Sequence, residues 1–139
     1  MDISINSSLV LPTANTLTAR SMVLSTSTLI NAGQVVYADP ISKQIGLAVA
    51  TDAIKSTNVV GVALTTSAAN QPIVFATAGD LTFNSNALTA ATTYVLSAAN
   101  PGGIAPTSDL VATNYGTILG IATGSASLRL DIVASGVQK

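Results

Sequence analysis

Few side chains in this sequence could carry out acid–base or nucleophilic chemistry. The 139 residues include no histidine, no cysteine and no glutamate. General bases, thiolate nucleophiles and most transition-metal sites depend on these residue types. Aspartates, lysines, tyrosines and many hydroxyls remain. We therefore predict a protein that is not an enzyme, with no catalytic residues, no cofactor, no metal ligands and no small-molecule substrate.

The charged residues that lie close in the sequence form pairs rather than clusters. Asp52 and Lys55 are three positions apart, and we interpret them as a solvated pair on a turn. Arg129 and Asp131 fall on one face of an expected strand, where cross-strand contacts are their ordinary role. No two aspartates have the spacing of a glycosidase pair or of a calcium-binding loop.

Tyr37 and Tyr94 hold equivalent places in two similar stretches of the chain. Exposed on one face, they would form a platform for a sugar ring. With aromatic residues at only 4% and no tryptophan, we favour core or interface tyrosines whose hydroxyls reach the rim. Burial of both rings would exclude the platform.

The charge of the chain is low and excludes several classes of partner. Charged residues make up 8% of the sequence, against about 25% in an ordinary soluble domain. The five basic residues are scattered, so we expect no nucleic-acid partner and no anionic membrane surface. Alanine, serine and threonine supply 55 residues, and the net charge is −1. Such a surface protects poorly against self-association, which suits a chain packed in an assembly.

Hydrophobic periodicity predicts short strands separated by turns. Apolar runs of five to seven residues recur between glycine- and proline-rich turns, and no helical period exceeds two turns. The fold class we predict is all-β, a compact sandwich or barrel of short antiparallel strands. Gly79-Asp80 is expected to end a strand that begins at Ile73, and residues 133–139 are expected to form a tail. No secretory signal and no transmembrane run are visible.

Two glycine-centred apolar stretches, Asn58 to Thr65 and Tyr115 to Thr123, resemble one another together with the strands around them. The offset between them is roughly 57 to 59 residues, which indicates duplicated β-motifs at 33–80 and 91–133. The alternative is a chance similarity between low-complexity strands. In the second stretch a period of two predicts Leu119 and Ile121 on one face and Ile118 on the other. Both faces are apolar or small, so we expect both to be covered.

The first 31 residues differ from the rest of the sequence. Apolar residues alternate with polar ones up to Pro12, and a polar stretch and a serine- and threonine-rich segment follow. We interpret residues 1–31 as an extended N-terminal arm and residues 32–139 as a single β-domain. If so, deleting residues 1–30 should leave the domain folded. The alternative is that the segment is the first hairpin of the domain.

Several short motifs resemble those of the decoration proteins, also called cement or head-stabilisation proteins, of tailed bacteriophage capsids. In the first half they are Gly33-Gln-Val-Val-Tyr37, Val59-Val-Gly-Val-Ala63 and a strand ending in Gly79-Asp80. The second half resembles a recurrent module in phage structural proteins of virion surfaces, through Ala91-Thr-Thr-Tyr-Val-Leu96, Gly103-Ile-Ala-Pro-Thr107, Leu119-Gly-Ile-Ala122 and Leu128 to Val133. The resemblance covers about residues 33–133.

This resemblance implies a β-domain, commonly a homotrimer, on the outer surface of the virion. Its partner there would be the major capsid protein, and it would stabilise the capsid by bridging neighbouring subunits. The alternatives are a fibre or tail component and a carbohydrate-binding or adhesin module. Apolar residues of the arm and the two tyrosines are the candidate assembly contacts: Ile3, Ile5, Leu9, Leu11, Met22, Leu24, Tyr37 and Tyr94.

Overall fold

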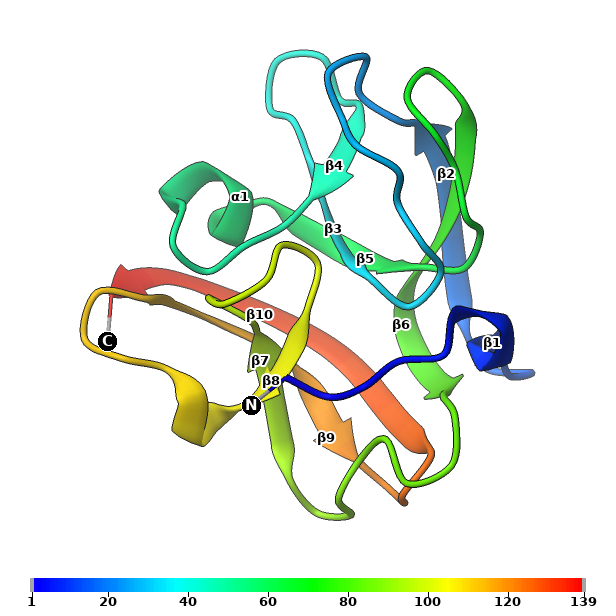
Figure 1. The fold of residues 1–139 in the computed structure, drawn as a ribbon, viewed down its shortest axis with the longest axis vertical. Coiled ribbons are helices and arrows are strands. Elements are labelled where there is room, and N and C mark those ends of the chain that lie inside the picture. Colours follow the sequence, from blue (N-terminus) through cyan, green and yellow to red (C-terminus); the bar gives the residue numbers. More distant parts are fainter. Residues whose placement is uncertain (1, 139) are drawn as a thin grey trace.

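A computed structural model, which describes residues 2–138, shows one curled antiparallel sheet of ten strands (Figure 1). The predicted all-β class is confirmed. In chain order the elements are η1 (Ser7–Leu9), β1 (Leu11–Pro12), β2 (Leu17–Met22), β3 (Val35–Ala38), β4 (Ile45–Leu47), α1 (Ala53–Thr57), β5 (Val59–Ala63), β6 (Pro72–Thr82), β7 (Thr93–Leu96), β8 (Ile104–Pro106), η2 (Thr107–Asp109), β9 (Tyr115–Ala122) and β10 (Ser127–Gln138). No helix among the described residues is long and apolar enough to cross a membrane.

The strand order is symmetric about its centre. It runs β4-β3-β5-β6-β10-β9-β7-β8, so β6 and β10 pair in the middle and each half repeats the same neighbours. The registers repeat as well: Val36 of β3 lies opposite Gly61, and Tyr94 of β7 lies opposite Gly120. A register shift follows directly in both pairs. The two similar stretches of sequence therefore occupy equivalent places in one sheet, and we propose that they arose by duplication.

The glycine in each half marks a β-bulge, and the bulge changes which side chains share a face. Leu119 is fully buried, whereas Ile118 and Ile121 are 41% and 44% exposed. The prediction that Leu119 and Ile121 share a face is therefore wrong, because the shift beside Gly120 interrupts the period of two. The expected cover on both faces is also wrong for this second half, although it holds for Val62 and Ala63 in the first.

Two apolar clusters stabilise the sheet. The smaller one lies within the first half and includes Val36, Ile45 and Phe75. The larger one lies between the two halves, where Val59 and Val62 of β5 meet residues of β9 and β10 such as Leu119 and Leu130. The first half is therefore covered on both faces, while the second half has one face in the core.

The N-terminal segment is extended and is built into the sheet. β2 pairs antiparallel with β6 from Pro72 to Ala78, and β1 pairs with the far end of β6. Val10, Val23 and Ile30 are 4%, 0% and 0% exposed, and each belongs to one of the two clusters. The segment thus supplies both core residues and two strands that pair with β6.

Candidate functional site

The charged residues with the spacing of a possible site serve as local structure. Asp52 is the N-cap of α1, where its carboxylate accepts hydrogen bonds from the backbone N–H of Ile54 (2.9 Å) and Lys55 (3.0 Å). Asp39 accepts from the N–H of Ile41 and Ser42, and these bonds lower the pKa of its carboxyl. No group of three or more metal-ligating side chains occurs among residues 2–138.

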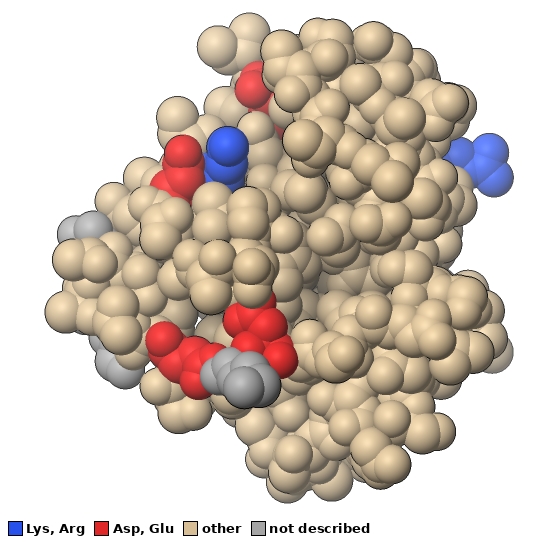
Figure 2. All heavy atoms as spheres, viewed as in Figure 1, with Lys and Arg blue, Asp and Glu red and all other residues tan. Residues whose placement is uncertain are grey.

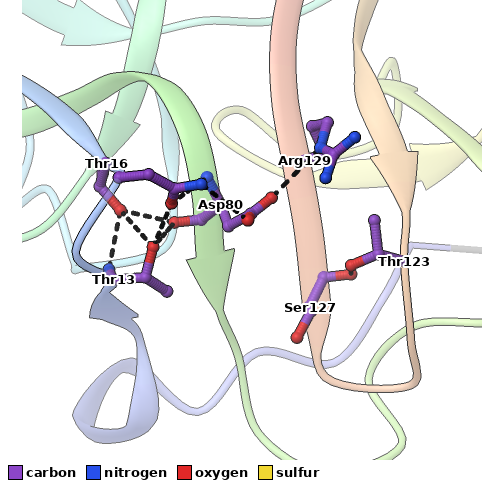
Figure 3. A network of polar contacts seen from close by, with 7 residues as sticks. Thr13, Thr16, Asp80, Thr123, Ser127 and Arg129 are labelled. Atoms are coloured by element: carbon purple, nitrogen blue, oxygen red, sulfur yellow. Dashed lines mark hydrogen bonds and ion pairs between the residues drawn. The ribbon is translucent and has the colours of Figure 1, made fainter.

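Asp80 forms the most connected polar network in the sheet (Figure 3). Its carboxylate accepts from the Asn15 amide at 3.0 Å and forms an ion pair with Arg129 of β10 at 3.4 Å. The hydroxyls of Thr13 and Thr16 donate to its backbone carbonyl at 3.1 and 2.5 Å. The Asn15 bond, followed by Arg129, holds the pKa of the Asp80 carboxyl below its usual range. The network anchors the turn between β1 and β2 to the C-terminal part of β6.

Gly79 lies within β6 rather than at its end, and the same turn explains why this position is a glycine. Gly79 has φ +94°, and a Cβ there would lie 2.2 Å from the carbonyl oxygen of Asn15. Only glycine leaves room for the turn between β1 and β2 to pass this close to β6. Pairing with β10 continues through Leu81 and Thr82, so the expected break at Gly79-Asp80 is wrong and one strand spans both sides.

Tyr37 and Tyr94 are core residues, 6% and 3% exposed. The Tyr94 hydroxyl accepts a 2.8 Å hydrogen bond from the Thr89 N–H. Tyr37 packs over Gly46, and its burial raises the pKa of its phenol. The sugar-binding platform is therefore excluded, and neither ring offers appreciable surface to a protein partner.

The six predicted contacts of the N-terminal segment divide into two sets. Ile3, Ile5 and Leu24 are partly buried against the larger core cluster. Leu9, Leu11 and Met22 are 46%, 55% and 41% exposed. Leu9 lies in η1, Leu11 in β1 and Met22 in β2, and these elements run along one side of the sheet (Figure 1).

The first residues of the segment are anchored. The Asp2 carboxylate accepts from the Ser97 hydroxyl at 2.7 Å and from the Asn100 amide at 3.0 Å. The N–H of Ile3 donates to the carbonyl of Ile104 in β8. Asn84 further holds the segment through the N–H of Asn6 and the carbonyl of Ser4.

Sequence reasoning missed much of the exposed apolar surface. Leu17 at the start of β2 is 63% exposed, and further large aliphatic side chains lie on turns and on the outer face of β9 and β10. Charged side chains are few on the face shown in Figure 2 and gather in small groups, which leaves wide uncharged areas. The low charge of the sequence is the signal that points to such a surface. Which residues are exposed depends on the bulges and on the path of the N-terminal segment.

Comparisons with known proteins give no match, whether with family models, with curated proteins or with solved structures.

Proposed function

We propose that this chain is a non-enzymatic virion structural protein that binds the outer surface of a tailed-phage capsid. There it bridges neighbouring subunits of the major capsid protein and stabilises the shell. The proposal combines the resemblance of the sequence motifs to those of phage decoration and virion-surface proteins with the character of the surface. The observation that carries it is the exposed apolar surface on a chain of which only 8% is charged.

The side of the molecule formed by η1, β1 and β2 is the capsid contact in this proposal. Leu11, Leu17 and Met22 are exposed on strands that pair with β6, and Leu9 is exposed in η1 just before β1. Burial of apolar side chains on a partner is favourable in proportion to the area removed from water. A rigid sheet beneath them also lowers the entropy lost on binding.

A binding experiment with undecorated capsids tests this proposal. Purified chain is mixed with capsids and sedimented, and bound protein is measured against concentration. Wild-type chain should saturate a fixed number of sites and raise the temperature at which the capsids break. Absence of binding to capsids of several tailed phages would contradict the proposal.

Point variants are suited to mapping the contact, because deleting residues 1–30 also removes the core residues Val10, Val23 and Ile30. Leu11→Lys and Leu17→Lys should each weaken capsid binding by about tenfold or more, as expected of central interface residues. Val111→Lys is the matched control, since Val111 is 60% exposed but lies in the loop between η2 and β9. Equal loss in all three variants would argue against a contact on the β1–β2 side.

A further inference from the structure

The outer face of β9 and β10 is an apolar surface on a regular part of the sheet. Ile118, Ile121 and Val133 are 41%, 44% and 53% exposed and surround a shallow hollow of about 320 Å³. We call this surface the β9–β10 face, and the residues that line it are Thr93, Ile118, Gly120, Ile121, Arg129, Asp131 and Val133. The open face of an antiparallel sheet is ordinarily polar.

The equivalent face of the first half is covered. The repeated registers place Thr93, Ile118 and Ile121 at the positions that Val35, Val59 and Val62 occupy in the first half. Those three valines are 0%, 9% and 0% exposed, because they pack in the cluster between the two halves. The first half therefore contains an equivalent of the β9–β10 face, and apolar residues of the sheet cover that equivalent face.

The charges on the β9–β10 face make it complementary to itself. Arg129 and Asp131 are two positions apart on one strand and line the same hollow. A second copy turned about a two-fold axis across the strands would place each Arg129 near the other copy's Asp131. Arg129 bonds to Asp80 through Nε at 3.4 Å, and because its side chain is 64% exposed its terminal nitrogens can also donate to a carboxylate of a second copy.

We propose that the β9–β10 face binds the same face of a second copy of this chain about a two-fold axis. The aliphatic side chains supply the buried area, and the reciprocal charge pairs fix the register, as in isologous interfaces. A net charge of −1 opposes the approach of two copies only weakly. This inference is independent of capsid binding. It predicts an even number of copies, where the resemblance to decoration proteins implies three.

Charge reversal tests the proposal by sedimentation velocity over a concentration series. The wild-type chain should form dimers. Arg129→Asp and Asp131→Arg should each weaken the dimer by about tenfold or more, since like charges then face one another. An equimolar mixture of the two variants should form mixed dimers, and the double variant should dimerise with itself. A contact between residues 129 and 131 of different copies predicts this rescue, and self-association of the double variant separates it from a general effect of net charge.

Two further variants separate the face from other surfaces. Ile121→Lys should dissociate the dimer, while Ile41→Lys should not, although Ile41 is 92% exposed in the turn between β3 and β4. Thermal unfolding of each variant shows that it remains folded. A wild-type monomer or trimer, or a dimer that the reversals leave intact, would overturn the inference. Capsid binding by a monomeric Ile121→Lys chain would still support the proposed function.

Discussion

At the scale of single residues, Gly61 and Gly120 are the positions least able to accept a side chain. A Cβ at Gly61 would lie 2.0 Å from the carbonyl oxygen of Ala76, and one at Gly120 would lie 1.9 Å from that of Arg129. We expect Gly61→Ala and Gly120→Ala each to lower the free energy of unfolding by about 2–3 kcal/mol, because strand backbone must move apart. Denaturant unfolding measures the loss. Gly124→Ala is the control, since a Cβ there meets nothing within 4 Å. An equal effect at all three positions would contradict this account of the bulges.

Asp80 gives a residue-scale prediction about pH. Its pKa is lowered in the folded chain, chiefly by Asn15, so its contribution to stability is present above the unfolded pKa and is lost as the pH falls through the folded pKa. In Asn15→Ala the pKa of Asp80 should rise towards the ordinary carboxyl range, and part of the stability lost on acidification should already be absent at neutral pH. Carboxylate NMR titration and unfolding at neutral and acidic pH measure both effects. Asp39 is the internal control because its pKa depends on Ile41 and Ser42. An unchanged Asp80 titration would mean that Asn15 is not the main cause.

At the scale of elements, the N-terminal segment decides whether the sheet can form. We predict that a chain lacking residues 1–30 does not fold, because β6 loses β1 and β2 and both clusters lose apolar residues. Circular dichroism and amide chemical-shift dispersion would show this. A milder change, Ile30→Ala, should cost about 2–5 kcal/mol because the side chain is fully buried. A truncated chain with native amide chemical-shift dispersion would instead support the interpretation of residues 1–31 as an arm separate from the domain.

The positions of most elements could be predicted from the sequence, whereas their faces and partners could not. The tail expected from residue 133 onward is wrong, because β10 continues to Gln138 and pairs with β9 along this stretch. Alternation alone predicts only the first part of β10, where Leu128 and Leu130 are buried and Arg129 is exposed. It fails at Leu119 because a bulge depends on the neighbouring strand rather than on local residue types. Alternation also predicts a break in β6 at Gly79, because the close approach of the turn between β1 and β2 is a tertiary feature that local sequence does not show. Of the candidate contacts, Leu9, Leu11 and Met22 are exposed, while the two tyrosines are buried in the larger core cluster.

At the scale of the whole molecule, the two halves of the sheet have equivalent strand orders but expose different amounts of apolar surface. The first half is covered on both faces, by its own small cluster and by the second half. The second half leaves the β9–β10 face open, and the N-terminal segment adds exposed leucines on the β1–β2 side. The molecule therefore has two separate apolar surfaces. We propose the β1–β2 side for a partner protein and the β9–β10 face for a second copy of the chain, so point variants should disable each contact without the other.

The low charge of the whole chain predicts how capsid binding responds to salt. Contacts made by aliphatic side chains are not screened, so the affinity should change by less than about threefold between about 0.05 and 0.5 M sodium chloride. Sulfate should strengthen binding, because it favours the burial of apolar surface. Co-sedimentation with undecorated capsids at constant pH measures both responses, with Leu17→Lys as a variant whose residual binding should be more sensitive to salt. A wild-type affinity that falls by orders of magnitude in sodium chloride would show that the few charged residues make the contact. The inference that this chain of low charge binds the capsid through apolar contacts would then be wrong, even if the chain still bound the shell.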